Sequence, residues 1–179
     1  MTESEQTGRE PRLSPALIAT LVAIPVMVLA GFIAFAVLRS DRASTLPIEG
    51  YSTSSENADL CGPLIAKLPE SFDDYRHKKV DGNTVTWTSN KNGDSGDPLM
   101  LRCGVARPKD LAPTSALQVI NAVQWFMTDS DTSRGQAFVV VDRRPYVAVW
   151  VPVGSGNGAL TDISGLVAGL PEAPLDFGH

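Results

Sequence analysis

Side chains that can act as acid–base catalysts are scarce in this chain of 179 residues. It contains two histidines, His77 and His179. His77 lies in the sequence DDYRHKK, residues 73–79, where charges of both signs outnumber the other side chains. Such a run is typical of a solvated surface, so His77 is not predicted to serve as the base of a catalytic triad.

Two pairs of carboxylates have the residue types that glycosidases use as acid and base. They are Asp73 with Asp74, and Asp129 with Asp131. Acids that are adjacent or alternate in polar loops could serve as the acid and base of glycoside cleavage, but they are usually just solvated. The sequence therefore predicts no catalytic residue.

The chain has two cysteines, Cys61 and Cys103. An even count in a small domain that follows a long apolar segment predicts a disulfide formed in an oxidising compartment. A structural zinc site needs three or four ligands, and the disulfide would occupy both cysteines. No metal site is predicted.

A glycine-rich segment, Gly154-Ser155-Gly156-Asn157-Gly158, follows a predicted strand and precedes a predicted helix. Dinucleotide-binding loops have this order. The preceding strand is predicted to belong to an antiparallel hairpin, and no later strand supplies a ribose-binding acid. We therefore expect a turn with Ser155 or Asn157 as the helix cap, and no cofactor.

Three tryptophans, Trp87, Trp125 and Trp150, fall one to each predicted strand. This distribution favours packing in the core, because large aromatic side chains supply much of the buried apolar area of a small domain. An aromatic groove for a ligand is the alternative.

The elements that position these residues follow a long apolar segment. Residues 13–38 carry no charge, and Ser14 and Thr20 are their polar side chains. About 20 residues suffice to cross the hydrocarbon core of a membrane, so a transmembrane helix is predicted, with residues 1–12 cytoplasmic. Secretion after signal-peptide cleavage is the alternative, since Ala34-Phe35-Ala36 fits a cleavage site.

Arginines flank the apolar segment equally on both sides, so the positive-inside rule does not decide the orientation in the membrane. The predicted disulfide does, because it requires an oxidising compartment and so places the part after the apolar segment outside. Residues 39–58, rich in serine, are predicted to be a flexible tether. Residues 59–171 form an extracytoplasmic domain, and residues 172–179 form a C-terminal tail. From residue 43 onward the chain carries the net charge of −5, which argues against binding nucleic acid.

The periodicity of residues 59–171 predicts an α+β fold, a small antiparallel sheet with two flanking helices and one disulfide. A first helix, capped by Asp59 and ended by Pro69, has apolar residues at helical spacing, and a last helix ends before Pro171. The disulfide would join the first helix to the sheet. The apolar positions are Leu60, Leu64, Ile65 and Leu68 in the first helix, and Leu160, Ile163, Leu166, Val167 and Leu170 in the last.

Strands are predicted from alternation and β-branched content. They lie around Val85 and Trp87, at Leu99–Val105, and at Ala137–Val141 and Tyr146–Val153, which Asp142-Arg143-Arg144-Pro145 joins as a hairpin. The polar stretch between Pro69 and Thr84 is expected to be rich in turns, and Asn90–Pro98 is expected to be a loop.

Residues 117–128 are ambiguous from periodicity alone. Leu117, Ile120 and Val123 fit one helix. Leu117 with Val119, and Val123 with Trp125, fit two strands instead.

Several of these segments together carry a resemblance to a known family. They are Cys61 with Leu64 and Leu68-Pro69, LRCGVARP at 101–108, PTSALQVINAVQWF at 113–126, and RRPYVAVWVP at 143–152. From Asp59 to Leu170 the chain resembles the actinobacterial family catalogued as domain of unknown function 3515. The resemblance implies a bacterial protein that is membrane-anchored or secreted, and it implies no reaction.

The family pattern also bears on the ambiguous segment. Many relatives have Asn-Gly where this chain has Asn121-Ala122, which favours a hairpin. Alanine weakens that argument, because it tolerates a positive φ poorly.

The sequence therefore predicts a single-pass protein of the plasma membrane whose exterior domain is a non-catalytic interaction module of the cell envelope. Its partner would be an envelope protein or a wall polymer. The alternative is an extracytoplasmic enzyme acting on cell-wall material, which would need a deep pocket with converging acids or a nucleophile and base. The oligomeric state is left open.

Overall fold

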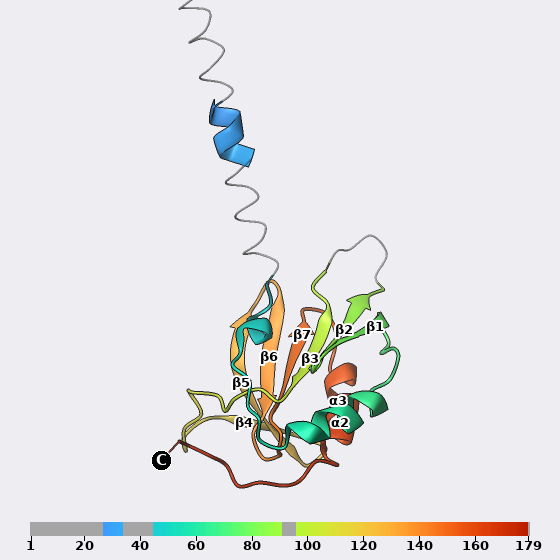
Figure 1. The fold of residues 1–179 in the computed structure, drawn as a ribbon, viewed down its shortest axis with the longest axis vertical. Coiled ribbons are helices and arrows are strands. Elements are labelled where there is room, and N and C mark those ends of the chain that lie inside the picture. The colour runs from blue at the N-terminus through green and yellow to red at the C-terminus, as the bar shows by residue number, and fades with distance from the viewer. Residues whose placement is uncertain (1–26, 34–44, 91–95, 179) are drawn as a thin grey trace, which may run out of the picture. The chain divides into compact units, whose positions relative to one another are not determined.

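The computed structural model describes residues 27–33, 45–90 and 96–178 (Figure 1). The chain divides into two compact units, Met1–Thr45 and Leu46–His179. In the first unit, residues 27–33 are helical and exposed. No helix within the described ranges is long and apolar enough to cross a membrane. Most of the predicted transmembrane segment, residues 13–38, lies outside those ranges, so the membrane anchor stays a prediction.

The second unit is built on one seven-stranded sheet, and every strand is antiparallel to its neighbours. The order across the sheet is β1-β2-β3-β7-β6-β5-β4. Together with two α-helices and two short 3₁₀ helices, this sheet confirms the predicted α+β fold. The strands are β1 (Tyr75–Asp81), β2 (Thr84–Ser89), β3 (Leu99–Cys103), β4 (Leu117–Ile120), β5 (Val123–Asp131), β6 (Gly135–Val140) and β7 (Val147–Pro152). The helices are η1 (Pro47–Gly50), η2 (Ala58–Leu60), α2 (Cys61–Lys67) and α3 (Gly158–Val167).

Alternation along the strands produces two buried faces. Helices α2 and α3 lie side by side and cover one face (Figure 1). Beneath them, Trp87 and Trp125 are buried in the larger core cluster. On the other face, Trp150 is buried in a second cluster with Leu46 and Ile48. The central strand β7 is buried on both sides, which explains its nearly continuous apolar sequence.

The predicted strands around Val85, at Leu99–Val105 and on either side of the Asp142–Pro145 connection are confirmed. In β3, Leu99, Leu101 and Cys103 face the helices, whereas Met100 belongs to the opposite cluster. The closing helix is also confirmed as α3, which buries Leu160, Ile163 and Val167.

The flexible tether predicted for residues 39–58 is wrong for residues 46–58. Leu46 and Ile48 are buried against the sheet. Arg102 donates from Nη1 to the carbonyl oxygens of Ile48 and Glu49 at 3.0 and 2.7 Å. Thr53 forms a β-bridge with Val105. Two well-placed apolar side chains thus outweigh the serine-rich composition, because they fill the face that the α-helices leave open. Residues 39–44 lie outside the described ranges.

The polar stretch between Pro69 and Thr84 was expected to be rich in turns, but it contains the edge strand β1. Its sequence lacks apolar alternation because it lies at the rim of the sheet, and a bulge between Arg76 and Lys79 interrupts its period. Lys78 anchors it by donating from Nζ to the carbonyl oxygens of Ile65 and Leu68 at 3.2 and 2.7 Å, at the end of α2. Carbonyl groups in the last turn of a helix lack the donor four residues further on, so the ammonium of Lys78 supplies hydrogen bonds to them and fixes β1 to the end of α2.

The ambiguous residues 117–128 form the hairpin β4–β5, so the helical alternative is wrong. Asn121 and Ala122 make its two-residue turn, with φ of 50° and 59°. Positive φ at both central positions is what a type I′ turn requires. The amide of Asn121 donates to the carbonyl oxygen of Thr161 at 2.9 Å, which holds the turn against α3.

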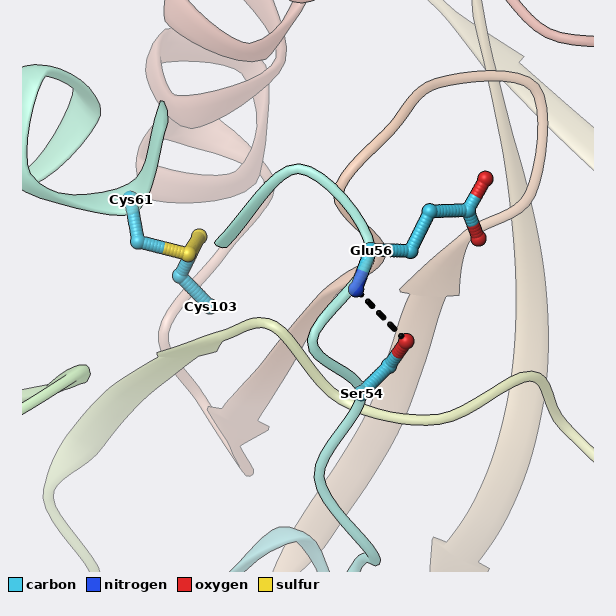
Figure 2. The surroundings of a disulfide bond; sticks show 4 residues. All are labelled: Ser54, Glu56, Cys61 and Cys103. Carbon is cyan, nitrogen blue, oxygen red and sulfur yellow. Dashed lines mark hydrogen bonds between the residues drawn. A yellow bond between two sulfur atoms is a disulfide. The ribbon is translucent and has the colours of Figure 1, made fainter. Parts of the chain in front are cut away.

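The predicted disulfide joins Cys61, at the start of α2, to Cys103, at the end of β3, and so connects the first helix to the sheet (Figure 2).

The predicted cap of the first helix is wrong, because Asp59 lies within η2 and Leu60 occupies the N-cap position of α2 without a side-chain hydrogen bond. A 3₁₀ turn that runs straight into the helix leaves no place for a capping side chain before it.

Candidate functional site

The structure places His77 on the exposed side of edge strand β1, with φ of 56°, within the bulged part of the strand. The side chains of Asp73 and Asp162 line the same open pocket. Within the described ranges, no hydrogen bond or ion pair joins His77 to either carboxylate. The three groups share a surface without forming the bonded relay that a catalytic triad requires.

The carboxylates Asp129 and Asp131 lie on β5, whereas the sequence suggested a polar loop. Asp131 accepts hydrogen bonds from the hydroxyl and backbone N–H of Ser133 at 2.6 and 2.8 Å, and from the N–H of Arg134 at 3.2 Å. These bonds lower the pKa of Asp131, with the Ser133 hydroxyl making the largest contribution. A carboxylate held ionised in this way fixes the β5–β6 turn and is poorly suited to donate a proton.

The glycine-rich segment 154–158 connects β7 to α3, as predicted. Both neighbours of β7 are antiparallel to it, so the parallel sheet of a dinucleotide-binding fold is absent from the described residues. Asn157 occupies the N-cap position of α3 without a side-chain bond. Ser155 instead shares a 2.6 Å hydrogen bond with the hydroxyl of Tyr75 and fixes the loop to β1.

All three tryptophans are fully buried. Trp87 and Trp125 pack beneath the helices, and Trp150 packs on the opposite face. Core packing is confirmed, and the alternative of an aromatic ligand groove is wrong.

The sequence did not indicate a cavity of about 270 Å³ that lies on the sheet face opposite the helices. Three parts of the chain form it, namely the segment after η1, the loop after β3, and strands β5 and β6. Its lining residues are Gly50, Tyr51, Ser52, Ala106, Arg107, Pro108, Lys109, Asp110, Thr128, Asp129 and Val139. We call it the Tyr51 cavity.

Apolar and polar groups are arranged together in the Tyr51 cavity. Val139 is buried in the second core cluster, against which the ring of Tyr51 packs. The hydroxyls of Tyr51 and Thr128 lie 2.6 Å apart in a hydrogen bond, and that of Thr128 also donates to the carbonyl oxygen of Ala137 at 3.3 Å. Because Thr128 donates to Ala137, its oxygen is placed to accept from the hydroxyl of Tyr51.

The environment of Tyr51 keeps its hydroxyl neutral. Burial raises its pKa above 10, the hydrogen bond to Thr128 lowers it in part, and the charge of Asp129 raises it again. A neutral phenol on an apolar floor is suited to bind a ligand by contact and hydrogen bonding.

Charges of both signs surround the opening of the Tyr51 cavity. Lys109 and Asp110 are exposed. The guanidinium of Arg107 donates to the carbonyl oxygen of Pro108 at 3.0 Å and lies 3.8 Å from Asp176 of the C-terminal tail. The rim therefore offers cations and carboxylates to a partner with mixed polar groups.

A second feature that the sequence did not indicate is a pair of buried arginines in the β6–β7 connection. Arg143 forms ion pairs with Asp142 at 3.1 Å and with Glu172 at 3.2 Å. Arg144 lies 3.9 Å over the ring of Tyr146 and pairs with Glu56 at 3.5 Å. These contacts fix the segment before α2 and the C-terminal tail to the sheet, and two adjacent arginines before a proline were the signal available in the sequence.

Comparison with known proteins adds a family and no activity. A family model described as "Protein of unknown function (DUF3515)" matches residues 22–175. No curated protein and no solved structure matches the chain.

Proposed function

The chain belongs to the DUF3515 family of proteins of unknown function, and we propose that it is a membrane-anchored, extracytoplasmic module of the cell envelope that binds a partner without catalysis. The observation that carries this proposal is the Tyr51 cavity. It combines an apolar floor, a neutral phenol and a rim of mixed charge, and it holds no paired nucleophile and base among its described lining residues.

The extracytoplasmic placement rests on two features of the chain. Residues 13–38 are long and apolar enough to span a bilayer. The disulfide between Cys61 and Cys103 suits an oxidising compartment, because cytosolic reductants keep most thiols reduced.

The partner class follows from the chemistry of the cavity. Tyrosine is enriched at binding surfaces, because its ring supplies apolar contact while its hydroxyl supplies a hydrogen bond. A segment of an envelope protein or a wall polymer offers the matching groups, namely amides or hydroxyls beside apolar or ring carbons. The net charge of −5 disfavours nucleic acid as the partner.

The binding proposal is tested by a photo-activated crosslinking residue placed at Lys109, on the rim, in cells that make the protein. Lys67 is the matched control, because it is also an exposed lysine and lies on α2, outside the cavity lining. We expect one envelope protein or wall fragment to be captured at Lys109 and lost with Arg107→Glu. Equal capture at Lys67 would overturn the assignment of the cavity.

Membrane topology is tested separately with a membrane-impermeant thiol reagent. Ser55→Cys is the reporter, because Ser55 is exposed whereas the neighbouring Ser54 is half-buried and hydrogen-bonded through its N–H to Gly104. We expect labelling of Ser55→Cys in intact cells and labelling of Thr7→Cys only after lysis. The reverse pattern would invert the orientation, and a mature chain lacking Thr7 would indicate a cleaved signal peptide.

An enzyme acting on cell-wall material is the second candidate, and the pocket shared by His77, Asp73 and Asp162 is the observation in its favour. We expect His77→Ala and Asp73→Asn to leave cellular function intact, because removing exposed polar groups usually changes stability by less than about 0.5 kcal/mol. Loss of function in His77→Ala at an unchanged melting temperature would favour the enzyme.

A further inference from the structure

The two edges of the sheet are protected very differently. Edge strand β1 carries the exposed cations Arg76 and Lys79 and has a bulge between them, which are features that prevent a second strand from pairing. The opposite edge strand β4, Leu117–Ile120, has the sequence LQVI, with no charge, no proline and no bulge. An unprotected edge presents unpaired backbone N–H and C=O groups to another strand.

The register of the β4–β5 hairpin shows which backbone groups are available. Ile120 and Val123 flank the two-residue turn, so they exchange both hydrogen bonds, as do Gln118 and Trp125 one step further along. The backbone groups of Leu117 and Val119 consequently point away from β5. Within the described ranges no strand or bridge pairs with this side of β4.

The side chains along this edge are apolar and accessible. Val119 is 69% exposed, and Leu117 is half-buried on the same face. Ile120 lies on the other face, against the helix-covered core. A strand added to β4 would cover Leu117 and Val119.

The absence of charge around β4 indicates which kind of strand can pair with it. Residues 111–128 contain no charged side chain, although the chain as a whole has a net charge of −5. Two copies that meet through this stretch bring no charges of the stretch itself together, so like-charge repulsion between these residues does not oppose the contact.

We propose that a second copy of this chain binds the β4 edge, with β4 paired antiparallel to β4 about a two-fold axis through Gln118. In this register Leu117 of each copy lies opposite Val119 of the other, and the outward backbone groups make four hydrogen bonds. The arrangement is isologous and closed, so it stops at a dimer. Strand β4 has four residues, so we expect this short pairing to be weaker than a stable interface, which buries roughly 1,000 Å² or more.

The proposal is independent of the Tyr51 cavity and is tested on the purified full-length chain in detergent. In this register the two Gln118 Cα atoms form a non-hydrogen-bonded pair about 4.5 Å apart, within the range of a disulfide. Gln118→Cys is therefore expected to form a covalent dimer of twice 19.1 kDa under mild oxidation. Cys61 and Cys103 are buried, 0% and 1% exposed, and do not compete for the new thiol.

The matched control is Val80→Cys on edge strand β1, where Val80 is 50% exposed. We expect Gln118→Cys to dimerise at least about tenfold faster than Val80→Cys, and Val119→Lys to remove that advantage, because it places like charges at the proposed contact. Val80→Lys in the Gln118→Cys background should have no effect. Equal rates for the two cysteine variants, or a rate insensitive to Val119→Lys, would overturn the proposal.

Discussion

Two tyrosines on the same face of the sheet differ in what their hydroxyls contact. Tyr51 shares a 2.6 Å hydrogen bond with Thr128, and its ring packs against the second core cluster. Tyr146, a member of that cluster, is 3% exposed, and its hydroxyl has no hydrogen-bond partner among the described residues. The contrast separates a hydroxyl that stabilises the fold from one that costs free energy.

Replacing each tyrosine by phenylalanine should change stability in opposite directions. Tyr146→Phe is expected to raise the free energy of unfolding by about 1 kcal/mol, because it removes a buried unsatisfied hydroxyl and keeps the ring under Arg144. Tyr51→Phe is expected to lower it by about 1 kcal/mol through loss of the bond to Thr128. Urea unfolding of both variants measures the effects, and a stability loss in Tyr146→Phe would mean that its hydroxyl has a partner.

The same tyrosines make stability depend on alkaline pH. Burial is the largest cause that raises the pKa of both Tyr51 and Tyr146 above the value of about 10 found in an unfolded chain. Between the unfolded and folded pKa values the unfolded chain has lost the proton that the folded chain retains, so the unfolded state gains stability as pH rises. The contribution of the two protonated phenols to the stability of the folded state is fully present below about pH 10 and is lost as the pH rises through their folded pKa values.

We therefore expect unfolding midpoints of the wild type to fall more steeply between about pH 9 and 11 than those of the Tyr51→Phe/Tyr146→Phe double variant. The double variant serves as the control, since every other ionisable group is common to the two proteins. Parallel curves would show that the two phenols titrate as they do in the unfolded chain.

At the scale of elements, the β4–β5 turn has the backbone of a type I′ turn but an alanine where glycine is favoured. Ala122→Gly should stabilise the protein by about 0.5–1 kcal/mol, because relief of a positive φ of 59° exceeds the entropy that glycine adds to the unfolded chain. Thermal unfolding measures the change. Ala116→Gly is the matched control, an exposed alanine without positive φ, and should be neutral or destabilising.

Elements with strong apolar periodicity were predictable from the sequence. Strands β2, β3, β6 and β7 and helix α3 each have an apolar face that matches a sheet or helix period, and the disulfide followed from the cysteine count. Strand β1 was not predictable in this way. It lies at a polar edge, is interrupted by a bulge, and is held by Lys78 through carbonyl groups on α2.

The Tyr51 cavity was not predictable, for a related reason. Its lining comes from the segment around Tyr51, the loop around Arg107 and strand β5 near Thr128, which are far apart in sequence and carry no shared motif. After β3 the chain crosses to the far edge of the sheet at β4 and returns through β5 and β6 to β7, which pairs with β3. This topology brings the three parts together. The serine-rich composition of residues 39–58 also led to the prediction of a tether, so the burial of Leu46 and Ile48, which fix the first of these segments to the sheet, was not predicted.

At the scale of the whole molecule, one covalent bond joins parts that otherwise meet through short elements. The disulfide links residues 42 positions apart and encloses α2, β1, β2 and β3 in one loop. Helix α2 has seven residues, too few to be stable alone, so its position depends on tertiary contacts and on Cys61. The disulfide therefore helps to hold α2 against the sheet, where the helix covers part of the larger core cluster.

Removing the disulfide should be the most destabilising of these changes. In the chain-entropy model a loop of this length contributes about 4 kcal/mol, a large share of the roughly 5–15 kcal/mol that holds a small domain folded. We expect a Cys61→Ser/Cys103→Ser variant to lose about that amount, measured by urea unfolding. Adding a reductant to unfolded wild type and refolding it should reproduce the loss, whereas the variant should not respond to reductant.

Accessibility of the two sulfur atoms provides the complementary test on the native protein. Cys61 and Cys103 are 0% and 1% exposed, so a reductant reaches them only when the structure opens. Alkylation should therefore require reductant together with denaturant, and mass spectrometry should then show two added groups. Alkylation of the folded protein without reductant would mean that the thiols are free, and it would remove the main support for an extracytoplasmic domain.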